Sequence, residues 1–232
     1  MKAFIGFLFI AVFPSVFALP VHAQDEEETI VRIWPRKSDG LILEFTNDFW
    51  LDVPEGVELR PVSVGFKGHF YIDHVFGNSA FSFAWGLGIS ADNVHSNARP
   101  IRIENPADAE DYMTFSPYPE EHEYEKNKFV TTYLELPLEF RVITRERTPF
   151  KLALGMRFGC LLSDHWKIID EVGGKRKEYD FDYVTKWRYG VNARIGVGKF
   201  SLTGFYSLTT IFEENKGIPL VPVSVGLTFA PF

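Results

Sequence analysis

Charged side chains recur inside stretches of the sequence that are otherwise apolar. Glu135, Glu139 and Arg141 alternate with leucine and phenylalanine in "VTTYLELPLEFRVI" (130–143), and Arg157 stands in a similar stretch downstream. Such carboxylates and guanidinium groups either line a narrow polar conduit or pair with one another and fill an interior, because buried charges must be paired or solvated. We favour the filled interior. The predicted cluster consists of Glu44, Lys67, His69, Glu135, Glu139, Arg141, Arg157, Arg188 and Arg194.

A serine and a histidine, the residue types of nucleophilic catalysis, occur close together in "SDHW" (163–166). Neighbouring side chains of an extended chain point in opposite directions, so we do not expect Ser163 and His165 to act as nucleophile and base. We interpret this stretch as a plain loop, and His69 as a hydrogen-bonding residue rather than a catalytic base. The sequence therefore predicts no enzyme activity and no cofactor.

Residues 92–127 form a long, acidic and proline-containing stretch. Carboxylate oxygens bind Ca²⁺, but their spacing here matches no calcium loop, so we expect a solvated loop and no metal. Long loops are often functional, and exposed aromatic residues are typical of protein interfaces. The candidate external partner loop carries Tyr112, Phe115, Tyr118 and Tyr124. The shorter stretch "GGKRKEY" (173–179) is predicted to be a turn with solvated lysines.

The charged residues lie in eight segments of the sequence. In each segment apolar residues repeat at every second position. This period predicts strands with two unlike faces. Most segments reach the roughly 9–11 residues that a tilted strand needs to cross a bilayer. Short and long connections alternate between them, as they do in outer-membrane barrels. The segments lie at about 40–50, 60–73, 80–91, 130–143, 149–162, 184–196, 199–209 and 220–229.

The size of the side chains on the two faces distinguishes a membrane barrel from a soluble one. The polar face contains small residues such as Gly86, Gly88 and Gly155, which suit the narrow interior of an eight-stranded barrel. The other face carries bulky leucine, valine and phenylalanine, as lipid requires. We therefore predict an all-β fold, an eight-stranded antiparallel up-and-down transmembrane β-barrel with a small polar lumen. Pro137 has no N–H, so we expect a bulge or a local break in the ladder there.

The first residues predict export through a cleaved signal peptide. Lys2 is followed by an apolar stretch that Pro14 interrupts and by small residues at Val21 and Ala23. The predicted organisation is a signal peptide at 1–23, a polar periplasmic lead-in at 24–39 and a barrel at 40–232. The predicted location is the outer membrane of a Gram-negative bacterium.

Composition limits the partners of the protein. The formal net charge of −7 argues against a nucleic-acid partner, which requires a basic surface. The single cysteine, Cys160, allows no internal disulfide. The expected partners are outer-membrane lipid and other envelope proteins, and the oligomeric state stays open.

Three stretches carry a resemblance to a known family: "YLELPLEFR" (133–141), "YGVNARIGVGKFSLTGFYSLTTIFEENKG" (189–217) and "PVSVGLTF" (222–229). They resemble the PorT-like outer-membrane β-barrel family of Bacteroidota. The resemblance implies an eight-stranded barrel, maps no catalytic motif, and suggests an accessory role in type IX secretion as one option. We expect a non-enzymatic structural or accessory component of an envelope assembly. The alternative is a narrow pore or a small-ligand receptor that uses the charged lumen residues.

Overall fold

Eight long strands form the main body of the protein. The computed structural model describes residues 38–104, 111–118, 124–170 and 174–231, and no helix in these ranges is long and apolar enough to cross a membrane. The predicted signal peptide, and the predicted lead-in up to residue 37, lie outside the described residues. The eight strands are β1 (Leu41–Leu51), β2 (Val64–Val75), β3 (Phe81–His95), β6 (Tyr124–Ile143), β7 (Phe150–Asp170), β9 (Trp187–Val197), β10 (Phe200–Ser207) and β11 (Val221–Phe229).

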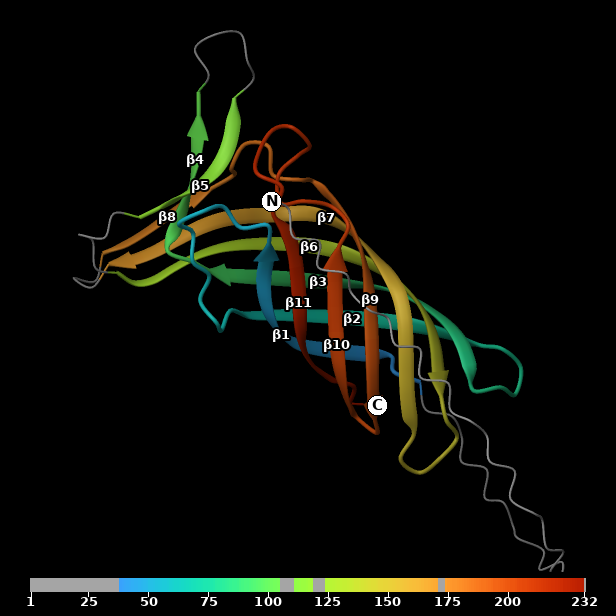
Figure 1. Cartoon of the computed structure of the whole chain (residues 1–232). Helices are drawn as coiled ribbons and strands as arrows, with labels where there is room; N and C mark the ends of the chain where they lie inside the picture. Colours follow the sequence, from blue (N-terminus) through green and yellow to red (C-terminus); the bar gives the residue numbers. More distant parts are fainter. Residues whose placement is uncertain (1–37, 105–110, 119–123, 171–173, 232) are drawn as a thin grey trace, which may run out of the picture. The chain divides into compact units, whose positions relative to one another are not determined.

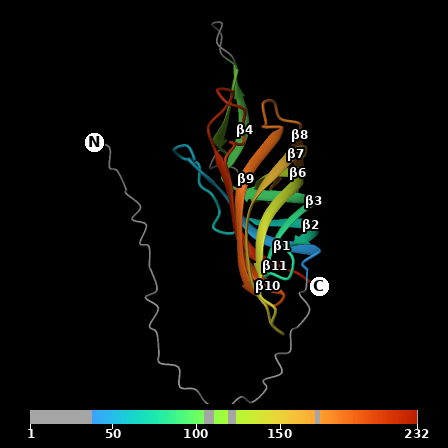
Figure 2. The ribbon, with the colours of Figure 1, turned by 90° about the vertical axis from the view of Figure 1, so that its right-hand side faces the viewer.

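The eight strands pair into a closed antiparallel barrel. Their order is β6-β3-β2-β1-β11-β10-β9-β7, and the pairing of β6 with β7 closes the ring; the neighbours can be followed in Figures 1 and 2. Each of the eight predicted segments corresponds to one barrel strand, so the predicted fold class is confirmed. In this ring β1 and β7 are separated by three strands on either side, so they face each other across the lumen.

The alternation along the strands places apolar side chains outside the barrel and polar ones inside. Phe70 on β2, Phe140 on β6 and Leu227 on β11 are 68%, 65% and 58% exposed. In contrast, Lys67 and Glu139 are completely buried. A soluble barrel would show the reverse distribution, and so large an exposed apolar surface marks contact with lipid.

The ladder of β6 is irregular at three places. On its β3 side the pairing is interrupted between Trp85↔Leu138 and Gly88↔Glu135 without a change of register. The interruption coincides with Pro137, which has no N–H to donate, so the break expected there is confirmed and no residue is inserted. Shifts of register between β6 and β7 lie instead at Thr132/Tyr133 and at Tyr124/Lys126.

Short connections join the strands at one end of the barrel. Between β9 and β10 the turn has only two residues, Gly198 and Lys199. Gly198 has a φ of 64°, which suits glycine in such a tight hairpin. The long connections lie at the other end, which faces outward from the cell in outer-membrane barrels.

The long connections contain strands of their own, contrary to the sequence prediction. β4 (Ala98–Ile103) and β5 (Tyr112–Pro117) form a hairpin within the segment interpreted as a loop. β8 (Lys175–Tyr179) pairs with the outer end of β7, so "GGKRKEY" is not a simple turn. The "SDHW" stretch is also not a loop, because β7 continues through it and its residues pair with β6. These strands depend on partners distant in sequence, which local patterns do not reveal.

Candidate functional site

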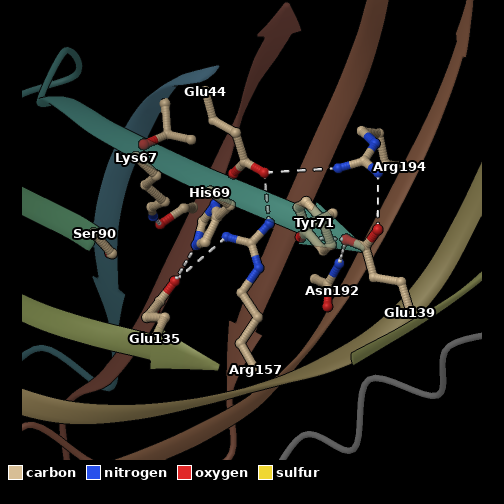
Figure 3. Close-up of polar contacts among 12 residues, drawn as sticks. Glu44, Lys67, His69, Tyr71, Ser90, Glu135, Glu139, Arg157, Asn192 and Arg194 are labelled. Carbon is tan, nitrogen blue, oxygen red and sulfur yellow. Dashed lines mark hydrogen bonds and ion pairs between the residues drawn. The ribbon is translucent and has the colours of Figure 1, made fainter. Parts of the chain in front are cut away.

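The lumen holds a continuous network of buried ion pairs (Figure 3). Residues from β1, β2, β3, β6, β7 and β9 contribute to it because every second side chain of each strand points inward. The lumen is narrow enough that opposite strands reach each other through a single pair of side chains. All nine residues of the predicted cluster lie in this network, and each is at most 4% exposed.

The outer layer of the network is centred on Asp92, which binds two cations. Lys67 Nζ lies 2.6 Å from Asp92 Oδ1, and it also donates to Ser224 Oγ at 2.8 Å. Arg188 Nη1 pairs with the other oxygen of Asp92. The Arg188 guanidinium also stacks on the Tyr133 ring, with Cζ 3.9 Å from the ring centroid. These contacts hold both cations of this layer in fixed positions.

Glu135 and Glu44 connect the middle of the lumen. Glu135 accepts from Arg188 Nη2 at 2.5 Å, and its other oxygen lies 2.8 Å from His69 Nε2. Arg157 Nη2 donates to Glu44 Oε1 at 2.6 Å and its Nη1 lies 3.9 Å from Glu135. The sequence predicts that His69 is a hydrogen-bonding residue, and in the structure its partner is Glu135.

The inner layer surrounds Glu139. Arg194 Nη2 and Arg141 Nη2 each lie 2.8 Å from Glu139 Oε2. Tyr71 donates its hydroxyl to Glu139 Oε1 at 2.9 Å, and so does the Asn192 amide. Glu139 therefore accepts from four side chains, which satisfies its oxygens without water.

The network is balanced in charge. Its carboxylates equal its permanent cations in number, so the desolvation of each charge is offset by at least one partner. The carboxylates are Asp39, Glu44, Asp48, Asp92, Glu135 and Glu139, and the cations are Lys67, Arg141, Lys151, Arg157, Arg188 and Arg194.

Four members of the network were not in the predicted cluster. Asp48 lies an even number of residues from Glu44 on β1, and Lys151 an even number from Arg157 on β7, so both point into the lumen. The alternation alone would have identified them. Asp92 lies just beyond the predicted end of its strand. Asp39 was placed in the periplasmic lead-in, yet it is buried and pairs with Lys151 Nζ at 2.5 Å. The barrel interior therefore begins one residue earlier than predicted.

A second, apolar core lies on the side of the long connections, beyond the charged network. We call this region the external cap. Its aromatic centre joins Trp50 to Phe115 and Phe129, with ring centroids 4.8 and 6.1 Å apart. Between this centre and the charges is a cavity of about 10 Å³, lined in part by Asp48, Asp92 and Phe129. That space is close to the minimum for one water molecule. The buried core of the cap contains Trp50, Val94, Ala98, Met113, Phe115, Phe129, Trp166, Ile168, Val184, Ile211, Phe212 and Leu220.

The β4–β5 hairpin is fixed to the rest of the cap by backbone hydrogen bonds. The N–H of Met113 donates to the carbonyl of Lys216 at 2.8 Å, and the N–H of Ile218 donates back to Met113 at 3.0 Å. The base of the hairpin is closed by the Tyr118 N–H, which donates to the carbonyl of Asn97 at 2.7 Å. The hairpin is therefore an integral part of the cap.

The aromatic residues predicted to be exposed partner anchors have different roles in the cap. Phe115 is 3% exposed, so its interpretation as a surface anchor is wrong. Tyr118 and Tyr124 pack against the same core from its edge. Tyr112 is half-buried and lines a groove of about 730 Å³ together with residues 208–210, 212–215, 217 and 219. Alternation within β5 turns Phe115 inward, a feature that a loop interpretation could not capture.

Among the described residues, no hydrogen bond joins Ser163 to His165, the pair considered for nucleophilic catalysis. Ser163 and His165 lie on the same outward face of β7, contrary to the expected opposite directions, because they are two residues apart. The His165 ring packs on Tyr179 at 5.3 Å instead. Burial, and then Lys177, Lys128 and Lys167, lower the pKa of His165. No group of three or more His, Cys, Asp or Glu in the described ranges is arranged to hold a metal.

A closed barrel with a charged interior and an apolar exterior defines an outer-membrane β-barrel protein. Residues 42–213 match the family described as outer membrane protein beta-barrel domain. The chain belongs to this family.

Comparisons with individual proteins add two similar structures. No curated protein matches the chain. The crystal structure of Ail, the attachment invasion locus protein of Yersinia pestis, is similar at 12% identity and a TM-score of 0.34, over 82% of this chain and 95% of that one. Ail in complex with the heparin analogue sucrose octasulfate gives 12% identity and a TM-score of 0.31 over the same shares.

Proposed function

We propose that this protein is a non-enzymatic accessory barrel that presents its external cap to other envelope proteins. The observation that carries the proposal is a contrast between two regions of the molecule. Ion pairs fill the interior of the barrel, while the cap forms an ordered core above it. A filled barrel acts as an anchor, so the surface of the cap is left for specific contacts.

The groove beside Tyr112 is the contact surface that we assign to a partner protein. Its lining includes Tyr189, Thr209 and Glu213, which combine aromatic surface with polar groups. Interfaces use this combination of an apolar anchor and orienting polar contacts. Asn215, which lines one wall, has a φ of 62°, a left-handed conformation that asparagine adopts more readily than most residues.

The experiment combines extraction and cross-linking in native cells. A photo-reactive residue at Glu214 in the groove is compared with one at Arg147 in a short turn at the other end of the barrel. We expect a defined envelope protein to be cross-linked from Glu214 alone, and the same protein to be present when the mild-detergent extract is weighed by native mass spectrometry. A single unaccompanied chain, with no cross-link from the groove, would contradict the accessory role.

The more specific assignment is an accessory of type IX secretion in Bacteroidota. The three PorT-like stretches in the sequence support it. We expect a deletion strain to retain type IX cargo inside the cell and to recover export when the gene is restored. Unchanged export in the deletion strain would contradict this assignment and leave the broader accessory role intact.

The alternative function is a narrow pore or a small-ligand receptor within the lumen. It requires space that Arg157, Glu44 and Glu135 occupy with their ion pairs. Conductance across a planar bilayer separates the two functions. For an enzyme acting on lipid, Ser163→Ala and His165→Ala would have to abolish turnover, and we expect neither substitution to change it.

A further inference from the structure

A row of basic side chains crosses four neighbouring strands of the external cap. Lys128 on β6 is directly opposite Lys167 on β7, and Lys167 is directly opposite Lys177 on β8. On the other side of Lys128, its partner on β3 is His95. Directly opposite residues share one face of a sheet, so these four side chains form a continuous basic row.

The row is unfavourable for the isolated protein. Like charges placed directly opposite each other destabilise a sheet. None of the three lysines has a carboxylate of the described residues within ion-pairing distance. Lys128 Nζ donates instead to Asn93 Oδ1 at 2.6 Å, and Lys177 Nζ to the Tyr179 hydroxyl at 3.1 Å. Burial, and then Lys167, Lys177 and Lys126, lower the pKa of Lys128. An anion placed along the row would relieve this repulsion.

The position of the row relative to the membrane indicates where that anion comes from. The row lies on the same outward face as the lipid-contacting residues, further along β3, β6 and β7 and on β8, which extends the sheet there. Leu162 is 55% exposed and is the outermost of the strongly exposed large apolar residues on β7. Lys167 follows five residues later, or about 16 Å along a strand and about 12 Å along the membrane normal at the usual tilt. That height corresponds to the headgroups of the outer leaflet, directly beyond its hydrocarbon.

We propose that Lys128, Lys167 and Lys177 bind the phosphate groups of a phosphorylated glycolipid in the outer leaflet. Lysine is a point charge that suits phosphate, and the outward direction of the row places it against lipid rather than against the lumen or the groove. This inference does not depend on the proposed accessory role, only on the outer-membrane location. The row would fix the cap at a set height and orientation on the membrane surface.

The test measures lipid binding by the folded protein in detergent. Diphosphorylated lipid A is titrated, and the bound lipid is measured by native mass spectrometry at low and high salt. The variant Lys128→Gln/Lys167→Gln/Lys177→Gln is compared with Arg145→Gln/Arg147→Gln/Lys199→Gln, which removes the same charge at the short-turn end. At about fivefold per lysine, the row variant should bind on the order of a hundredfold more weakly. The control should bind as the unaltered protein does.

Two further comparisons separate phosphate binding from other causes. The variant with arginine at the same three positions should retain binding, and heat-modifiable mobility in electrophoresis verifies that each variant is folded. Dephosphorylated lipid A should bind weakly to the unaltered protein. Equal binding of lipid A by the row and control variants, or equal binding of phosphorylated and dephosphorylated lipid, would overturn the proposal.

Other occupants of the row also give distinct results. A soluble sulfated polysaccharide that displaces lipid A completely at equal charge concentration would overturn the assignment to lipid. So would lipid binding that appears only after Glu120, Glu121 and Glu123 are replaced by glutamine, because the chain's own acidic segment would then be the occupant.

Discussion

Arg157 on β7 reaches Glu44 on β1, the strand diametrically opposite in the barrel, with 2.6 Å between Nη2 and Oε1. Both side chains are 1% exposed. A single ion pair thus crosses the whole width of the lumen, and neighbouring pairs continue it toward both ends. This arrangement makes the interior a charged but filled core, and it places the functional surfaces outside the barrel.

The pair should be important for stability. Glu44→Gln leaves the buried Arg157 with only the more distant Glu135, and breaking a buried pair typically costs about 3–5 kcal/mol. We expect a decrease of this size in the free energy of unfolding, measured by urea titration in lipid vesicles. Asp182→Asn, which breaks an exposed pair with Arg102, is the control and should leave stability unchanged. Equal effects of the two substitutions would show that the lumen pair is solvated.

The outward face of β7 should tolerate charge only near the membrane surface. Leu154 and Leu162 are 56% and 55% exposed on the same strand, so they form a matched pair. Arginine on the lipid face costs about 2–4 kcal/mol at mid-bilayer and about 0–1 kcal/mol near the interface. We therefore expect Leu154→Arg to decrease the unfolding free energy in vesicles much more than Leu162→Arg. Two equally small changes would indicate that this face does not contact lipid.

The cap should loosen without loss of the barrel when its aromatic centre is removed. Phe115→Ala leaves a cavity between Trp50, Phe129 and Phe212, and such truncations typically cost about 3–5 kcal/mol. Hydrogen exchange of the Met113 amide, which bonds to Lys216, should become faster, while the heat-modifiable mobility of the barrel stays the same. Tyr112→Ala is the control, since that side chain lines the groove. Similar exchange in the two variants would argue against a cap core centred on Phe115.

The outer end of β7 should be less stable in acid. The pKa of His165 is lowered in the folded protein by burial and by Lys177, Lys128 and Lys167, so the opened state binds the proton first. The outer end of β7 is most stable while His165 is neutral. Its full stability is therefore present above the ordinary histidine pKa of about 6.5 and decreases as the pH falls through that value. Hydrogen exchange in β8, corrected for intrinsic rates, should accelerate over this range.

Substitution identifies His165 as the responsible group. His165→Gln should flatten the pH dependence of exchange in β8, whereas His74→Gln, at the short-turn end of β2, should leave it unchanged. An identical pH profile in the His165 variant would assign the effect to another group.

The barrel was predictable from the sequence because its strands are defined by local alternation. Leu134, Leu136 and Phe140 alternate with Glu135 and Glu139 in the sequence and on the two faces of β6 alike. Lipid and a narrow lumen impose the same pattern on every strand. Even the break at Pro137 follows from the chemistry of one residue.

The cap and the pairing of charges were not predictable in the same way. β4, β5 and β8 are held by contacts such as Met113 with Lys216, between segments far apart in the sequence. Nothing local indicates that Arg157 pairs with Glu44, because that contact depends on ring closure bringing β1 opposite β7. The position of Asp48 in the alternation of β1 indicates that its side chain faces the lumen, but it does not indicate which residue Asp48 pairs with.

The central claim, that ion pairs fill the lumen and the protein acts through its exterior, is tested most directly by single-channel recording. The purified barrel is inserted into planar bilayers, and the orientation and number of inserted molecules are verified by protease protection. We predict no unitary current steps from the unaltered protein over the range of voltages that the bilayer tolerates. Reproducible steps that disappear when Arg157 or Glu135 is substituted would contradict the account and assign the lumen to a conducting pore.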